Sequence, residues 1–213
     1  MDKNESTYVL RWAKKIKAIN FLGGKCEHCG EDDIFKLCFH HKDRNEKDFE
    51  FNDMKTYRWS LLKKEISKCQ LLCNNCHVVL HDNLDGKPKN KENINKLTFL
   101  KFKNIFECQK CGYNKNNKAL AFHHNHNKKF GLGDNHVVKR KYNTVYDLTN
   151  DIKNELKKCD ILCFNCHRLE HINIKKFNEY KKEIYKKVAN YKEKREPLDK
   201  NEIYKMYISG MKQ

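Results

Sequence analysis

The residues of this chain best suited to chemistry are cysteines and histidines, and they recur in the same order twice. Each copy has a Cys-x-x-Cys-Gly motif, then Phe-His-His, then a second Cys-x-x-Cys pair that continues into His-x-x-x-His. The copies run from Cys26 to His81 and from Cys108 to His171, with an offset of 82 residues at the first Cys and 90 at the last His. Two occurrences of one ordered motif indicate a duplicated module.

The paired cysteines have the spacing of a structural metal site. Four thiolates per copy would complete a tetrahedral zinc shell with no open position. A redox pair or a disulfide is the alternative, but four matched pairs in a duplicated frame favour zinc. We therefore expect two structural Zn²⁺ ions, one bound by Cys26, Cys29, Cys73 and Cys76, and the other by Cys108, Cys111, Cys163 and Cys166.

Metal binding would also compensate for a small hydrophobic core. Only 38% of the residues are hydrophobic and the mean hydropathy is −0.96, whereas a structural zinc site can contribute roughly 10–16 kcal/mol to folding. Of the three cysteines outside the pairs, Cys69 and Cys159 occupy equivalent positions before apolar runs. We expect them to be buried structural thiols rather than nucleophiles.

Each copy has four further histidines that the zinc does not need. Packing explains them poorly, because a core histidine must satisfy its ring nitrogens. A surface cluster, or a His that replaces a Cys at the zinc, is the alternative. Three imidazoles around one ion and a fourth free imidazole beside it are what metal-assisted hydrolysis requires. These residues are His40, His41, His77 and His81 in the first copy, and His123, His124, His167 and His171 in the second.

The elements that must position these residues can be placed coarsely from periodicity. Apolar residues at helical spacing predict an amphipathic helix over 7–21 and another over 97–106. Strands are expected over 34–39 and 119–122, so that each His pair lies at a strand end. Helices are expected over 61–67 and 148–156, and again after the third Cys of each copy. In that last helix the two histidines are four residues apart and share a face.

With these motifs the chain resembles a known family. FHH at a strand end, preceded by a CxxCG knuckle and followed by LLCNNCHVVLH or ILCFNCHRLEH, is similar to the zinc-stabilised HNH endonucleases of the ββα-metal fold. The resemblance covers about residues 21–84 and 103–175. It implies hydrolysis of a backbone phosphodiester that leaves a 5′-phosphate and a 3′-hydroxyl, with His41 and His124 as general bases. It also implies that a divalent ion such as Mg²⁺ or Mn²⁺ is held by His40, His77 and His81, and a second by His123, His167 and His171.

The chain departs from the family pattern at two positions in each copy. Lys68 and Lys158 stand where the family usually has its middle Asn, a residue that helps to fix the loop carrying the base. A His also replaces the Asp that many relatives have before the base. That replacement makes the ion site softer, so that Mg²⁺, Mn²⁺, Ni²⁺ and Zn²⁺ all fit.

The charge balance indicates a polyanionic partner. There are 45 Lys and Arg against 28 Asp and Glu, a formal net charge of +17, which suits phosphate neutralisation. We expect double-stranded DNA, although Lys-rich helices are often only solvated faces. Basic residues occur together with aromatic ones at 55–59 and 139–142, where the aromatics are either DNA contacts or parts of a small core.

The sequence therefore predicts an α+β protein built from two tandem small zinc-stabilised ββα-metal (HNH) modules with flanking helices. The expected divisions are a first module with its leading helix at 1–84, a polar linker at 85–96, a second module at 97–175 and a Lys-rich helical tail at 176–213. No apolar run approaches the ~20 residues of a membrane span. Free cysteines and the lack of a signal peptide favour a reducing compartment, the cytoplasm or nucleus.

Two sites in one chain also suggest a monomeric pseudo-dimer that cuts both strands. The alternative function is a zinc-stabilised DNA- or RNA-binding protein without catalysis. Such a protein would account for the charge and the cysteines, but it would not need the histidine set twice.

Overall fold

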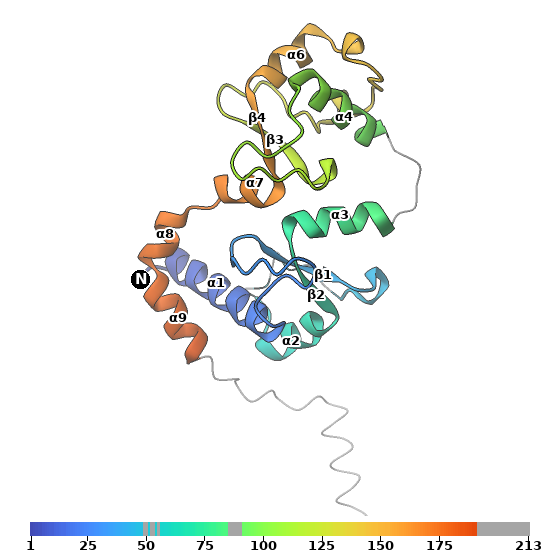
Figure 1. Ribbon diagram of the computed structural model, residues 1–213. Helices are drawn as coiled ribbons and strands as arrows, with labels where there is room; N and C mark the ends of the chain where they lie inside the picture. Colours follow the sequence, from blue (N-terminus) through green and yellow to red (C-terminus); the bar gives the residue numbers. More distant parts are fainter. Residues whose placement is uncertain (49–50, 52–53, 55, 85–90, 191–213) are drawn as a thin grey trace, which may run out of the picture. The chain divides into compact units, whose positions relative to one another are not determined.

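The computed structural model describes residues 1–48, 51, 54, 56–84 and 91–190. The described chain is mixed α+β, as expected, with two small two-stranded sheets among helices (Figure 1). Its helices are α1 (Lys3–Phe21), α2 (Trp59–Ser67), α3 (Asn74–Leu84), α4 (Lys91–Lys103), α5 (Asn135–Val138), α6 (Asn150–Lys157), α7 (Phe164–Glu170), α8 (Ile174–Glu179) and α9 (Lys181–Ala189), and short 3-10 turns include η1 (Arg44–Glu46), η3 (Asn117–Ala119) and η4 (Val145–Asp147).

Each sheet joins the strand that carries a His pair to a strand that ends at a zinc-knuckle Cys. β1 (Leu37–His41) pairs with β2 (Cys69–Cys73), and β3 (Leu120–His124) pairs antiparallel with β4 (Cys159–Cys163), with His124 opposite Cys159. The prediction that each His pair ends a strand is confirmed. We did not expect β2 and β4, because their apolar residues Leu71–Leu72 and Ile161–Leu162 are all buried and show no alternation that would signal a strand.

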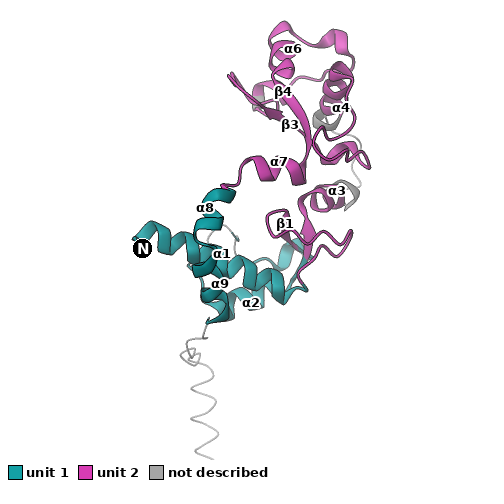
Figure 2. Cartoon of the chain, turned by 60° about the vertical axis from the view of Figure 1, so that its left-hand side comes forward, with its two compact units in different colours: residues 1–23, 41–70, 174–213 teal, residues 24–40, 71–173 magenta. Residues whose placement is uncertain are grey.

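The chain forms two compact units (Figure 2). The first comprises residues 1–23, 41–70 and 174–213, and the second comprises 24–40 and 71–173. Two of their boundaries fall within β1 and β2, and the other two follow α1 and precede α8, whereas the sequence suggested modules at 1–84 and 97–175. The predicted modules are defined by the repeated sequence motif, whereas the two units are defined by how the chain packs. The two divisions answer different questions, so the division into modules remains a prediction about sequence duplication.

In the first unit, α9 packs against α1, and α8 contacts α1 through Phe177. Helix α1 begins at Lys3 because Asp2 forms a capping box with Glu5. The Trp12 and Phe177 rings meet edge to face at 4.9 Å, and the Tyr180 hydroxyl donates to the Glu5 carboxylate at 2.6 Å. The expected Lys-rich helical tail is thus helical to Ala189, while residues 191–213 lie outside the described part of the chain.

In the second unit, α4 begins six residues before the predicted module boundary. Residues 91–96 were expected in the polar linker, but they are helical, and residues 85–90 lie outside the described residues. The Asn95 side chain donates to the Arg140 carbonyl and accepts from the Tyr142 backbone N–H, both at 2.8 Å. A polar residue in this stretch is therefore buried and hydrogen-bonded inside the fold, which a linker assignment from composition could not foresee.

Two aromatic residues in the candidate DNA-contact segments belong to the cores. Tyr142 is 3% exposed in a cluster with Phe99, Leu148 and Ile152, and Trp59 is 5% exposed. For these two side chains the core interpretation is the correct one. Among the described helices, none combines the length and the apolar character needed to cross a membrane.

Candidate metal centres and active site

The four paired cysteines of each copy converge as the spacing predicts. Their sulfur atoms form two groups, each with all members within 4.8 Å of one another. Sγ of Cys29 lies 3.7 Å from Sγ of Cys73, and the same 3.7 Å separates Cys111 from Cys163. Two sulfurs bound at ~2.3 Å to one tetrahedral ion would lie ~3.8 Å apart. Both groups are therefore compatible with a structural zinc ion.

Backbone geometry shapes the first half of each knuckle. Gly30 and Gly112, which follow the first Cys pairs, have φ of 77° and 69°, a conformation in which glycine avoids the steric cost of a Cβ. Their N–H groups donate to the carbonyls of Cys26 and Cys108 at 2.9 and 2.8 Å. This closes a tight turn that presents both sulfurs to the same side.

Two of the three cysteines outside the knuckles, Cys69 and Cys159, are buried, as expected. Cys69 and Cys159 are each 1% exposed, and their thiols lie 3.5 and 3.3 Å from the carbonyls of Glu65 and Glu155. Burial raises the pKa of Cys69 to about 12 and that of Cys159 to about 11. Neither thiol would ionise to a nucleophile near neutral pH.

Three of the four extra histidines in each copy form a second kind of cluster. His40 comes from β1, and His77 and His81 come from α3; in the second copy the equivalent residues are His123 of β3, His167 of α7 and His171, which directly follows α7. Each trio has ring nitrogens that lie within 4.8 Å of one another. The histidines predicted to hold a catalytic ion are therefore brought together in both copies.

The spacing within these trios suits a shared ion. The Nε2 atoms of His77 and His81 are 3.3 Å apart, and those of His167 and His171 are 3.5 Å apart. Nitrogens at ~2.0–2.1 Å from one tetrahedral ion would be separated by ~3.4 Å. Burial, and then the neighbouring imidazoles, lowers the pKa of His77 and of His167 to about 4. The neutral imidazole that a metal requires is thereby favoured.

The remaining histidine of the first copy, His41, contacts a buried carboxylate in the first unit. Its Nε2 lies 2.7 Å from Oε1 of Glu65, whose side chain is fully buried. The same Oε1 accepts from the Asp48 backbone N–H at 3.0 Å, and Nζ of Lys68 reaches Oε2 at 3.1 Å. Lys68 also donates to the Glu46 carbonyl at 2.8 Å. The Glu and Lys side chains thus tie His41 to the loop that follows it.

The second copy repeats this arrangement around His124. Its Nε2 lies 3.2 Å from Oε1 of Glu155, within ion-pair distance although not aligned for a hydrogen bond. Oε1 of Glu155 accepts from the Lys129 backbone N–H at 2.8 Å, and Nζ of Lys158 reaches Oε2 at 2.8 Å and the Asn127 carbonyl at 2.9 Å. The loop after the His pair is again closed by one Glu and one Lys.

This geometry gives Lys68 and Lys158 a structural role. The sequence left the fixing of the loop in doubt, because these lysines replace the Asn that the family resemblance would lead one to expect. The structure shows that each lysine donates to a backbone carbonyl of that loop, Glu46 or Asn127. A lysine can do so because its long side chain reaches across the loop while its charge offsets a buried carboxylate.

Glu65 and Glu155 are the residues that sequence reasoning missed. Both precede the Lys-Cys pair at the same distance, as Glu-x-x-Lys-Cys in EISKC and ELKKC. That repeated spacing was the available signal, but charged residues on Lys- and Glu-rich helices rarely stand out. Burial would raise the pKa of Glu155, but the Lys158 ammonium and the Lys129 N–H outweigh it and lower the pKa overall. The carboxylate is therefore ionised at neutral pH.

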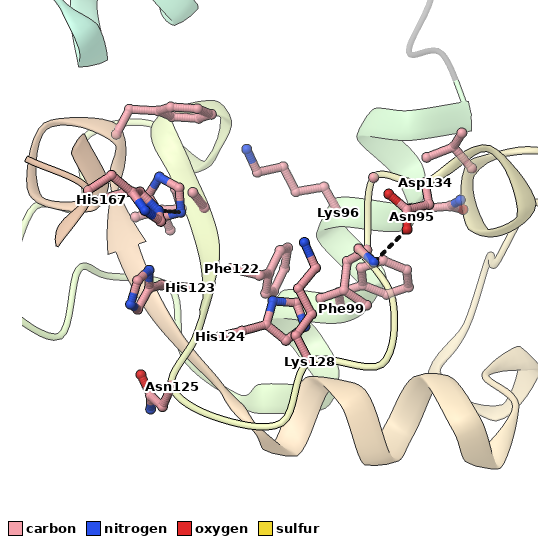
Figure 3. A pocket seen from close by; sticks show the side chains of 18 of the residues that line it. Asn95, Lys96, Phe99, Phe122, His123, His124, Asn125, Lys128, Asp134 and His167 are labelled. Carbon is pink, nitrogen blue, oxygen red and sulfur yellow. Dashed lines mark hydrogen bonds between the residues drawn. The ribbon is translucent and has the colours of Figure 1, made fainter. Parts of the chain in front are cut away.

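The four candidate site histidines of the second copy line one cavity of about 840 Å³, which also extends to Asn95, Phe99 and Asp134 (Figure 3). His123 and His124 are consecutive in β3, so strand alternation directs their side chains to opposite faces. Both line the cavity, so a molecule bound there would lie beside the trio of His123, His167 and His171 and beside His124.

Comparison of the chain with protein-family models, with curated proteins and with solved structures finds no match among any of them. The fold and sites define the chain as an α+β protein with two tetra-cysteine clusters that fit zinc and two tri-histidine clusters that could hold a metal ion.

Proposed function

We propose that the protein is a metal-dependent endonuclease of the HNH type that hydrolyses DNA phosphodiester bonds, with His41 and His124 as general bases. The observation that carries the proposal is the second-copy cavity, which places three convergent imidazoles and a fourth, carboxylate-backed imidazole around one space. A purely structural metal site would not need the fourth.

His124 is suited to take a proton from water. The Glu155 carboxylate beside Nε2 favours the tautomer with hydrogen on that nitrogen, which leaves Nδ1 as the acceptor. Burial lowers the pKa of His124, even though Glu155 opposes the shift. The ring would thus be neutral near pH 7, the form that a general base requires.

The trio of His123, His167 and His171 would hold the divalent ion, and the trio of His40, His77 and His81 would do so in the first copy. When bound, such an ion stabilises negative charge on the phosphoryl and leaving oxygens. The three imidazoles of each trio would hold and orient such an ion beside the base candidate. Mg²⁺, Mn²⁺, Ni²⁺ and Zn²⁺ remain candidates, since an all-imidazole set is softer than one with a carboxylate.

The net charge of +17 supports a nucleic-acid substrate, and double-stranded DNA is our proposal. Both copies retain the complete set of metal-ligand and base candidates, together with the same Glu and Lys partners. This retention supports a monomeric pseudo-dimer in which each copy cuts one strand.

Supercoiled plasmid tests the proposal directly. Zinc-loaded protein incubated with Mg²⁺ or Mn²⁺ should nick or linearise the plasmid, EDTA should prevent this, and the His41→Ala, His124→Ala double variant should be inactive. His136→Ala removes an exposed histidine outside both trios and should cleave like the native chain. Salt-sensitive binding without cleavage under any of these ions would instead support the non-catalytic zinc-stabilised DNA- or RNA-binding protein.

A further inference from the structure

The second-copy cavity is larger than a metal centre needs. Its volume of about 840 Å³ lies within the ~300–1,000 Å³ typical of pockets that take small-molecule ligands. In Figure 3, His123 and His167 lie toward one side, Asn95 and Asp134 lie toward the other, and His124 lies between them. The cavity therefore has room for a ligand beside the histidines.

The walls beyond the histidines are partly aromatic and apolar. Phe99 and Phe122 line the cavity and meet edge to face at 5.8 Å, and Leu132 and Val138 add aliphatic surface. Phe164, at the start of α7, is a further aromatic wall and is only partly buried. Such a surface accepts the face of a planar ring.

The rest of the wall is basic or amide-bearing. Lys96, Lys118 and Lys128 line the cavity together with Asn125 and Asn127. Nζ of Lys96 lies 5.3 Å from the centroid of the Phe164 ring and donates to the Lys118 carbonyl at 2.7 Å. A positive charge is thus held directly beside an aromatic face.

A ligand that matches these walls carries a planar ring, hydrogen-bonding edges and a negative charge. A nucleotide has all three. A base inside a duplex is stacked between its neighbours and cannot enter a cavity. Only an unstacked nucleotide could therefore occupy this one.

We propose that this cavity receives one unstacked nucleotide of the DNA, next to the phosphate at the His123, His167 and His171 trio. The inference rests on the proposed nuclease function and specifies its substrate as DNA that is locally unpaired or that opens easily. A paired strand would first have to release the base at a cost of a few kcal/mol. DNA that already contains an unpaired nucleotide would be bound and cut in preference, and negative supercoiling would favour the opening in plasmids.

The first copy supplies a conservative test substitution. Asn74 is its equivalent of Phe164, and its side chain donates to the Lys36 carbonyl at 2.6 Å. Because an Asn already begins the equivalent helix, Phe164→Asn should fold while removing the aromatic wall. Phe106→Asn is the matched control, because Phe106 is 41% exposed and does not line this cavity.

The experiment uses the full zinc-loaded chain without added divalent cation and measures binding by fluorescence anisotropy. The two probes are a fully paired duplex and the same duplex with one bulged 2-aminopurine, whose fluorescence reports unstacking. We expect at least tenfold tighter binding of the bulged probe. Phe164→Asn should weaken that binding by about tenfold, as loss of one base–aromatic stack would, and Phe106→Asn should leave it unchanged.

Equal affinity for the two probes, or an equal effect of Phe164→Asn on both, would overturn the nucleotide site. Cleavage of both duplexes with Mn²⁺ is measured separately. If Phe164→Asn removes the preference for the bulged probe and the protein cuts neither duplex, the result supports the cavity assignment and contradicts the nuclease function. Cleavage at equal rates, insensitive to Phe164→Asn, supports the nuclease and contradicts the cavity assignment.

Discussion

Asn75 and Asn165 exchange hydrogen bonds between the two knuckle helices. The Asn75 backbone N–H donates to Oδ1 of Asn165 at 3.2 Å, and the Asn165 N–H donates to Oδ1 of Asn75 at 2.9 Å. Each residue lies in the first turn of its helix, α3 or α7, where backbone N–H groups lack an intrahelical acceptor. Each copy thus caps the helix of the other, the reciprocal pairing that a two-fold interface shows.

Asn75→Ala and Asn165→Ala should each lower the free energy of unfolding by about 1–3 kcal/mol, because each leaves a buried N–H without its acceptor. Denaturant unfolding of the zinc-loaded protein measures this. Asn114→Ala, at an exposed position, should change stability by less than about 0.5 kcal/mol. Wild-type stability in either buried variant would contradict the capping role.

Lys158→Ala should slow plasmid cleavage by about tenfold or more, because the loop beside His124 loses its tether and small misplacements of catalytic groups are costly. It should also cost about 1–3 kcal/mol of stability, since Glu155 stays buried without its ammonium partner. Lys157→Ala removes an equal charge from the neighbouring exposed residue, the last of α6. A similar loss in both variants would show that net charge matters and that the tether does not.

Glu155→Gln should reveal a pH-dependent contribution to stability. The pKa of Glu155 in the folded chain lies below its ordinary value of 4.5, so the carboxylate stabilises the fold fully above that pH. The contribution is lost as pH falls through the lower folded pKa. The difference in unfolding free energy between native and variant protein should be constant from about pH 8 to 6 and shrink below pH 4.5. A difference that grows on acidification would contradict this ionisation state.

Metal analysis should separate two kinds of site. After gel filtration the protein should retain two zinc ions, one per tetra-cysteine group, and titration should add up to two weaker divalent ions at the tri-histidine groups. His167→Ala should remove one weak ion and leave both zinc ions in place. Removal of zinc by a strong chelator should unfold the knuckles, because their binding energy is folding energy, and circular dichroism should follow the loss.

Single base variants test whether each copy cuts one strand. His41→Ala and His124→Ala should each convert linear plasmid product into nicked circles, because one site remains active. The two rates of nicking need not be equal, since His41 is hydrogen-bonded to Glu65 while His124 is not aligned for that bond with Glu155. Full linearisation by either variant would show that the altered copy is dispensable.

The sequence alone determined the local parts of this protein. The spacing of short motifs predicted which cysteines and histidines lie close together, because knuckle turns and helix periodicity act over a few residues. These motifs are four Cys-x-x-Cys pairs, two Phe-His-His and two His-x-x-x-His. The helices and the His-bearing strands followed from the same short-range rules, with ends displaced by a few residues. The grouping of each cysteine quartet and histidine trio needed only the added assumption that the repeat reflects one fold.

Only the tertiary structure decided which distant groups support these motifs. Four features join residues that are far apart in the sequence. They are the contact of Glu155 with His124, the tether from Lys158 to Asn127, the Asn75–Asn165 exchange and the hydrogen bond from Tyr142 to Asn95. Charged and amide side chains are usually solvated, and then they need no partner in the protein. Only when tertiary packing excludes water must each buried polar group form a hydrogen bond inside the fold, so these partners cannot be predicted from the sequence.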